Sequence, residues 1–265
     1  MPSDSAAQVV PKAPEPSSSA TNEGRSGPPA GSEVLLMLLA DARLPTGAHT
    51  QSAGLEPAMH QGLSLDQVPD YIRTRLRTVV AVEAGAAVVA RHIVVSAVQS
   101  GSAGRPGSVE GLAAGLQSVD DAWHARTVSP ALRENAQALG RGYTRLVEGL
   151  WPDDPAVAAL RAVRRPTRAV AVGVAGALAM LSAAQVARLI GYDDAQTVAA
   201  AALKLDPLDP LVVTGWIVRV ADDIDRMVAA VVQLSAAEQI PAGTAPLIEQ
   251  WAQLHAATSQ RLFRA

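Results

Sequence analysis

The sequence contains no cysteine and few aromatic residues, with one Phe, three Tyr and four Trp among 265 residues. The absence of cysteine excludes disulfides, thiolate metal sites and a thiol nucleophile, and it is consistent with a cytoplasmic location. The apolar content is mostly Ala, Val and Leu. Because these side chains are small, helices can approach one another closely, and we expect many short helices that pack tightly.

The sequence also lacks a basic excess, since its formal net charge is −3 and its pI is about 6.0. Phosphate binding normally needs such an excess, so the composition argues against a nucleic-acid surface. One uncharged segment, Ala169 to Ala187, has nearly the length of a membrane span. It consists mostly of Ala and Gly, and Leu181-Ser182 indicates a helix stop followed by a new N-cap. We therefore expect no membrane span.

Residues 1–32 are rich in Pro, Ser, Gly and Glu and lack the apolar core of a signal peptide. We expect a disordered tail there. The remaining residues, 33–265, are long enough to form one large domain, and 49% of the sequence is hydrophobic. The flexible stretch from Ser100 to Ser108 connects two parts of that domain rather than two domains.

Apolar residues recur at helical spacing along the domain, and no segment alternates apolar and polar residues over more than a few positions. The sequence therefore predicts an all-α, single-domain bundle of about ten helices. The predicted helices lie at 33–42, 51–62, 66–98 with a break near Gly85, 109–125, 130–150, 154–163, 167–181, 182–190, 193–205, 211–234 and 246–260.

The residue types needed for catalysis and metal binding are present but poorly spaced. No two of the five histidines have the three- or four-residue spacing that places paired ligands on one helix face. Asp41, His49 and Ser52 lie in one loop, but no nucleophile elbow or phosphate-binding glycine pattern accompanies them. We predict no catalytic residue and no metal site, and a small helical enzyme is the third of three alternatives.

A second alternative is a DNA-binding regulator. The stretch from Leu181 to Lys204 resembles a helix-turn-helix, with a capped helix that ends at Gly191, a short turn and a second helix. Only Gln196, Thr197 and Lys204 of that second helix are able to reach base edges. Basic residues for phosphate contacts are scarce around it, so this interpretation ranks below an interaction protein.

A basic cluster surrounds Pro166 and consists of Arg161, Arg164, Arg165 and Arg168. A solvated helix end explains it, because cations are favourable near the negative end of the helix dipole. Contact with a partner or a phosphate is the other interpretation.

Three separated stretches resemble a known family. In "LPTGAHTQSAGLE" the matching residues are Leu44, Pro45, Gly47, Ser52, Gly54, Leu55 and Glu56. In "LRENAQALGRGYTRL" they are Arg133 and the step Gly140-Arg141. In the closing segment, 245–265, they are His255, Arg261, Leu262, Phe263 and Arg264. In this order and spacing the sequence is similar to the urease accessory protein UreF family over about 33–265.

The sequence departs from the family pattern at three places. His49 stands where an aromatic residue is usual, and Gln51 stands where an aromatic residue or His is common. The family's Arg-Leu-x-Pro-Leu-Gly-Gln segment is replaced by Lys204 to Pro210, which lacks its Gly and Gln.

The resemblance implies an all-α, cytoplasmic protein that forms a homodimer and has no catalytic activity or cofactor of its own. It implies three partners: the scaffold UreD, also called UreH; the GTPase UreG, which binds GTP and nickel; and the urease apoprotein. The family bridges UreD and UreG in the complex that delivers nickel to urease. It implies no nucleic-acid or membrane partner.

The same resemblance suggests a role for the loop from Leu44 to Glu56. Its Pro, glycines and hydroxyls suit a rigid docking surface, and we expect the matching residues to bind partners. The single Phe of the chain, Phe263, lies between two arginines, a combination typical of interface hot spots, although a frayed terminus is the alternative. We hypothesise that residues Arg261 to Arg264 become ordered when UreD binds.

Overall fold

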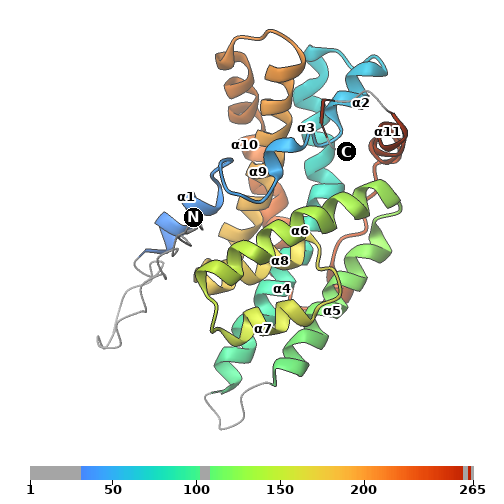
Figure 1. Cartoon of the computed structure of the whole chain (residues 1–265). Helices are drawn as coiled ribbons and strands as arrows, with labels where there is room; N and C mark the ends of the chain where they lie inside the picture. Colours follow the sequence, from blue (N-terminus) through green and yellow to red (C-terminus); the bar gives the residue numbers. More distant parts are fainter. Residues whose placement is uncertain (1–30, 102–107, 259–261, 264–265) are drawn as a thin grey trace, which may run out of the picture.

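The computed structural model describes residues 31–101, 108–258 and 262–263 (Figure 1). Residues 1–30 lie outside the described residues, so the disordered tail stays a prediction. Arg261 and Arg264 also lie outside them. The described residues form eleven α-helices, three short 3-10 helices and no β-strand, which confirms the all-α prediction.

Most of the helices are joined by short connections, and longer ones precede α2 and α11. Their bounds are α1 (Ser32–Leu39), α2 (Leu55–His60), α3 (Val68–Arg77), α4 (Val79–Gly101), α5 (Val109–Arg126), α6 (Pro130–Leu150), α7 (Pro155–Ala162), α8 (Arg168–Leu178), α9 (Ala183–Leu205), α10 (Pro210–Val231) and α11 (Pro246–Ala257). The 3-10 helices are Ala48–Thr50, Leu65–Gln67 and Ala237–Gln239.

Several helices begin with a polar capping residue followed by proline. The side chains of Ser129, Asp154 and Asp209 accept hydrogen bonds from backbone N–H groups in the next turn, at 3.3, 2.8 and 2.9 Å. Proline occupies the first turn in each case, where its missing N–H costs no hydrogen bond. The predicted starts of α6 and α7 are thereby confirmed.

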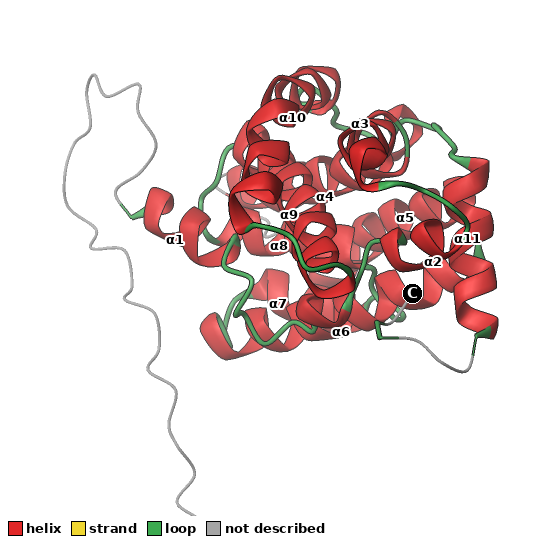
Figure 2. Ribbon diagram, turned by 90° about the horizontal axis from the view of Figure 1, so that it is seen from above, coloured by secondary structure: helices red, strands yellow, loops and turns green. Residues whose placement is uncertain are grey.

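Helix α4 lies at the centre of the bundle and packs against α8, α9 and α5. Helix α6 covers α8, and α10 covers α9, so α4 and α9 lie between α3 and α10 on one side and α6 and α7 on the other (Figure 2). By length and composition, Val79–Gln99 of α4 meets the criteria for a membrane span, and 61% of its apolar window is buried inside the protein. A core helix meets the same criteria, and α4 occupies that position.

The small side chains predicted to allow close helix contacts do so between α4 and α8. A Cβ atom at Gly173 of α8 would lie 2.5 Å from the Ala87 carbonyl oxygen of α4. The two backbones are therefore in direct contact, and the position accepts only glycine.

The predicted helix break near Gly85 is wrong. Gly85 lies inside α4, where an added Cβ would be 2.8 Å from Pro241 Cδ. The chain instead breaks at Thr78, with φ −124° and ψ −101°. The Thr78 hydroxyl donates to the Thr74 carbonyl at 2.7 Å, and this side-chain bond competes with the regular backbone ladder.

The predicted helix end at Gly191 is also wrong, because α9 runs without interruption from Ala183 to Leu205. Gly191 is buried against α10, where a Cβ would lie 2.9 Å from Met227 Cε. Asp193 and Asp194, at the start of the helix predicted for 193–205, are buried within α9. There is no turn and no separate recognition helix here, so the helix-turn-helix alternative has no support.

Candidate functional site

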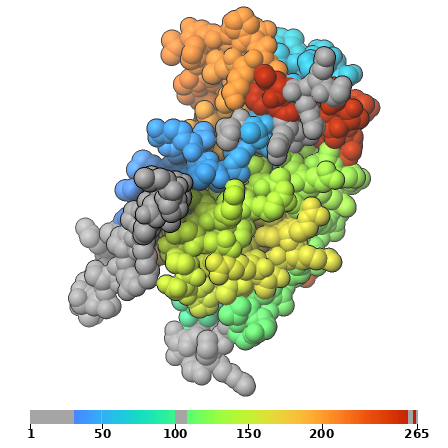
Figure 3. All heavy atoms as spheres, viewed as in Figure 1, coloured from blue at the N-terminus to red at the C-terminus, as the bar shows by residue number. Residues whose placement is uncertain are grey.

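The stretch from Leu44 to Glu56 comprises most of the loop between α1 and α2 and the first two residues of α2, and it lies against α6. Gly47 and Gly54 adopt left-handed backbone conformations, with φ of 87° and 78°, which glycine adopts without strain. A Cβ atom on Gly142 of α6 would overlap the Thr46 carbonyl group. The loop is therefore fixed on the α6 backbone, and its blue surface adjoins the yellow-green surface of α6 in Figure 3.

The two halves of this loop have different environments. Pro45 is exposed, and Leu44 and Gly47 are half-buried. The second half is buried and comprises Ser52, Gly54, Leu55 and Glu56. Only the first half therefore presents a surface, while the second half belongs to the interior.

The hydrolase-like grouping in this loop is not assembled. The half-buried Asp41 carboxylate accepts hydrogen bonds from Arg43 Nε at 2.9 and 3.1 Å, and Arg43 holds the pKa of Asp41 at about 2. The Ser52 hydroxyl is buried and has no hydrogen-bond partner among the described residues. Asp41 is thus committed to Arg43, and Ser52 is not accessible to a substrate.

Glu56 is the centre of a buried junction between α2, α11 and the C-terminal segment. Its Oε2 lies 2.8 Å from His255 Nε2, with both side chains almost fully buried. The backbone N–H groups of Leu262 and Phe263 donate to Oε1 and Oε2 at 2.7 and 3.0 Å. Because a carboxylate only accepts hydrogen bonds, His255 Nε2 carries the proton that points to Glu56. We call these four residues the Glu56 latch.

The two described tail residues have opposite exposures. Phe263 is only 4% exposed and belongs to the hydrophobic core, with Lys204 Nζ 5.1 Å from the centre of its ring. Leu262 is 63% exposed. A partner therefore reaches Leu262 without any movement of the chain, whereas contact with Phe263 requires the latch to open.

The predicted residues on α6 also divide into packing and surface positions. The Arg133 guanidinium donates to the Thr127 and His124 carbonyls at 2.5 and 3.0 Å, which satisfies the end of α5. A Cβ on Gly140 would overlap the Pro166 carbonyl oxygen. Arg141 is exposed. Of these three residues, only Arg141 presents its charged end to solvent without an intramolecular hydrogen bond to a described residue.

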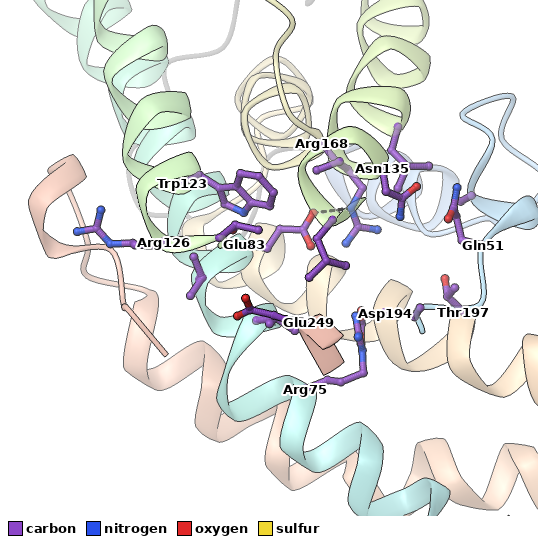
Figure 4. A pocket seen from close by; sticks show the side chains of 18 of the residues that line it. Gln51, Arg75, Glu83, Trp123, Arg126, Asn135, Arg168, Asp194, Thr197 and Glu249 are labelled. Atoms are coloured by element: carbon purple, nitrogen blue, oxygen red, sulfur yellow. Dashed lines mark hydrogen bonds and ion pairs between the residues drawn. The ribbon is translucent and has the colours of Figure 1, made fainter. Parts of the chain in front are cut away.

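A cavity of about 90 Å³, lined by both charged and apolar side chains, lies among α3, α4, α6, α8 and α9 (Figure 4). Arg75 binds Asp194 through two hydrogen bonds, at 2.9 and 2.6 Å. Arg168 donates to Glu83 at 2.6 Å and also pairs with Asp193. The cavity has room for a few water molecules, and its charged side chains hold four helices together.

Electrostatics in this cavity follow from burial and pairing. Burial raises the pKa of Asp193, although Arg168 opposes that shift. Burial lowers the pKa of Arg75, but attraction from Asp194 and Tyr71 outweighs it, and the net pKa is raised. The arginines thus remain charged, as a buried ion pair requires. Sequence reasoning missed this cluster, although Arg75 beside the apolar positions Ile72 and Leu76 was an available signal.

Comparison with known proteins shows to which family the chain belongs. The UreF profile matches residues 64–221, which is more than half of the chain. The chain belongs to the UreF family. The match covers α3 to α9 and part of α10, and it leaves the Leu44–Glu56 loop and α11 outside.

Named UreF relatives support the assignment over most of the chain. Urease accessory protein UreF of Mycobacterium sp. (strain JLS) is 34% identical over 232 residues, covering 86% of this chain and 96% of that protein. UreF of Mycobacterium marinum is 33% identical over 237 residues, covering 87% and 97%. UreF of Mycobacterium bovis (strain BCG / Pasteur 1173P2) is 32% identical over 239 residues, again covering 87% and 97%.

Metal-ligating side chains are dispersed in the part of this UreF-family chain that the structure describes. There, no group of three or more His, Asp or Glu side chains is placed to hold a metal ion. His255 pairs with Glu56, and His124 lies 3.5 Å from Asp120. Each of these histidines contacts one carboxylate; the contact of His255 joins α11 to α2, and that of His124 lies within α5.

Proposed function

We propose that this chain is a non-enzymatic assembly protein of urease maturation. It bridges UreD (UreH) and the GTPase UreG, acts in the cytoplasm as a homodimer and promotes insertion of nickel into the urease apoprotein. Nickel is the cargo of the complex and is carried by UreG. The observation that carries this proposal is the similarity to urease accessory protein UreF over 86% of the chain and 96% of the relative.

The C-terminal surface suits the contact with UreD. Leu262 is exposed on a backbone held by the Glu56 latch, and Leu247 and Leu254 of α11 are exposed at 60% and 45%. An apolar side chain on a fixed backbone loses little conformational entropy on binding, which favours affinity. Arg261 and Arg264 flank this segment in the sequence, and we assign them to the same contact.

The other predicted partner-binding residues act in two ways under this proposal. Surface and half-buried residues make contacts themselves: Leu44, Pro45, Gly47 and Arg141. Buried residues, and Arg133 with its internal hydrogen bonds, hold the contacting segments in place: Ser52, Gly54, Leu55, Glu56, Arg133, Gly140, His255 and Phe263. A buried residue of this kind affects binding only through the position of its neighbours.

Co-expression with the UreD and UreG proteins of the same genome tests the function. Complexes are sized by light scattering after gel filtration. We expect a stable complex with UreD that recruits UreG in the presence of nucleotide. Elution of the folded chain alone, with neither partner bound, would overturn the proposed function.

A matched pair of variants tests the tail contact. Leu262→Glu places a charge on the exposed side chain but keeps the backbone N–H that binds Glu56, so folding is retained. Val98→Glu makes the same type of change at a 73% exposed position near the C-terminal end of α4. We expect Leu262→Glu to weaken UreD binding at least about tenfold and Val98→Glu to leave it unchanged. Equal binding by the two variants would remove Leu262 from the interface.

A further inference from the structure

Most described arginines are held by a carboxylate or a backbone carbonyl of the same chain. These are Arg43, Arg73, Arg75, Arg77, Arg91, Arg126, Arg133, Arg161, Arg168, Arg188 and Arg226. Within the described residues, no such acceptor binds the side chains of Arg141, Arg145, Arg164, Arg165 and Arg219. All of these are exposed, and all but Arg219 belong to α6 or to the turn that precedes Pro166.

Two of these arginines line a surface groove of about 550 Å³. Arg141 and Arg145 are one helical turn apart on α6, so their guanidinium groups are on the same face. Thr46 and Gly47 of the α1–α2 loop and Pro166 also line the groove. Arg165 directly precedes Pro166 in the sequence. The positive charge that lines the groove thus comes from Arg141 and Arg145 of α6.

The walls of the groove are fixed by close backbone contacts. The Thr46 carbonyl lies against Gly142 and the Pro166 carbonyl against Gly140, with no room for a Cβ at either glycine. Arg165 has a positive φ of 59°, a strained conformation for a residue other than glycine. Strain of this kind persists only where the surrounding structure enforces it. The positive groove is therefore a preorganised feature of the fold.

The chemistry of the groove selects its occupant. Guanidinium groups bind carboxylates through paired, charge-assisted hydrogen bonds. A nucleic acid needs an extended basic surface, and this chain has a net charge of −3. A short acidic segment of a protein needs only the few cationic groups that the groove supplies.

We infer that the groove between α6 and the α1–α2 loop binds an acidic segment of a partner protein through Arg141 and Arg145. The inference rests on the proposed function in one respect, namely that the partner belongs to the urease maturation complex. Binding of an acidic probe by the isolated chain does not depend on that function, so the two are tested separately.

The first experiment uses the full-length chain and two labelled probes, an oligoglutamate peptide and an oligothymidylate of matched charge. Arg141→Glu and Arg145→Glu are compared with Arg219→Glu, which makes the same charge change at the unpaired arginine on α10. All three positions are exposed, so each variant is expected to fold. We expect each α6 variant to weaken oligoglutamate binding about tenfold, with Arg219→Glu within about twofold of the wild type.

Three results would overturn the inference. The first is an absence of measurable oligoglutamate binding by the wild type at low salt. The second is an equal loss of binding in all three variants, which would indicate only the change in net charge. The third is preferential binding of oligothymidylate that depends on Arg141, which would indicate a nucleic-acid surface instead.

The second experiment repeats the co-expression assay with the double variant Arg141→Glu/Arg145→Glu. We expect one of UreD, UreG or urease to be lost from the complex while the others are retained, and we expect Arg219→Glu to keep all of them. Full assembly by the double variant would overturn the inference. Failure of the wild type to assemble would contradict the proposed function, and the probe experiment would still decide the chemistry of the groove.

Discussion

The Glu56 carboxylate and the His255 imidazole lie 2.8 Å apart in the interior, although 199 positions separate them in the sequence. The same carboxylate accepts two backbone N–H groups from Leu262 and Phe263. One side chain of α2 therefore fixes both α11 and the segment that follows it. This contact makes the beginning and the end of the domain one unit.

Loss of the Glu56 carboxylate is expected to be costly. Glu56→Ala leaves His255 and two backbone N–H groups buried without their acceptor, and we expect the free energy of unfolding to fall by about 3 kcal/mol. Urea denaturation measures this change. Glu110→Ala, at an exposed position in the first turn of α5, is the control and should change it by less than about 0.5 kcal/mol.

The Glu56 latch also predicts that two changes in it have non-additive effects on the free energy of unfolding. A chain that ends after Gln260 lacks the two N–H groups that Glu56 accepts, so this truncation and Glu56→Ala remove the same hydrogen bonds. We expect their combined cost to be smaller than the sum of the single costs by about 1 kcal/mol. Strict additivity in urea denaturation would mean that the tail does not bind Glu56 in solution.

Two glycines of α6 provide a matched test of close packing. Gly140→Ala forces a methyl group into the Pro166 carbonyl, whereas Gly149→Ala meets nothing within 4 Å. We expect the first change to destabilise the protein by about 3 kcal/mol and the second to stabilise it by about 0.5 kcal/mol. Thermal unfolding of the two variants compares them directly. Equal effects would contradict the backbone contact between α6 and the turn before α8.

The arginines around Asp223 predict that the stability of the protein depends on pH. Burial opposes its ionisation, but Arg226, Arg73 and Arg77 outweigh that effect and hold the pKa of Asp223 below its ordinary value. A lowered pKa in the folded state gives stability that is present above the unfolded pKa of about 4 and lost as the pH falls through the folded value.

Asp223→Asn should therefore reduce the free energy of unfolding by about 1 kcal/mol at neutral pH, since the arginines are largely exposed. The difference from the wild type should vanish in strongly acidic solution. Asp225→Asn, in the exposed pair with Arg188, is the control and should have little effect at either pH. Urea denaturation at several pH values measures both. A difference that persists in acid would contradict the assignment.

The ion pair of Arg75 and Asp194 predicts that a second substitution restores stability lost through the first. Arg75→Met leaves the Asp194 carboxylate buried without its partner and should cost about 3–5 kcal/mol. Arg75→Met/Asp194→Leu removes both charges and should recover most of that loss, because apolar pairs replace buried ion pairs well. A double variant as unstable as the single variant would indicate that water or other groups in the cavity need these charges.

Local signals predicted much of the fold. Capping side chains followed by proline predicted where α6 and α7 begin, and the spacing of hydrophobic residues predicted most of the helices. Glycine was the unreliable signal, because the sequence does not distinguish a glycine that ends a helix from one against which another side chain packs closely. Met227 packs against Gly191, and Pro241 packs against Gly85. The break at Thr78 has no proline or glycine to mark it.

The candidate site was predicted less completely for a different reason. The loop from Leu44 to Glu56 was expected to be a docking surface, yet Glu56 points inward to a histidine on the last helix. No local pattern encodes a contact between residues so far apart. The paired and unpaired arginines likewise differ only in their spatial neighbours, so Arg145 of the groove could not be selected from the sequence.

The Glu56 latch holds the chain end by its backbone N–H groups, and any residue other than proline supplies the same donor at position 262. Substitutions at Leu262 therefore leave the latch intact, while they change the side chain displayed at the surface. If Leu262 contacts a partner as proposed, a single substitution there changes the contact without removing the hydrogen bond that holds the segment. Partner specificity at this position is then able to change without an intermediate that loses its structure.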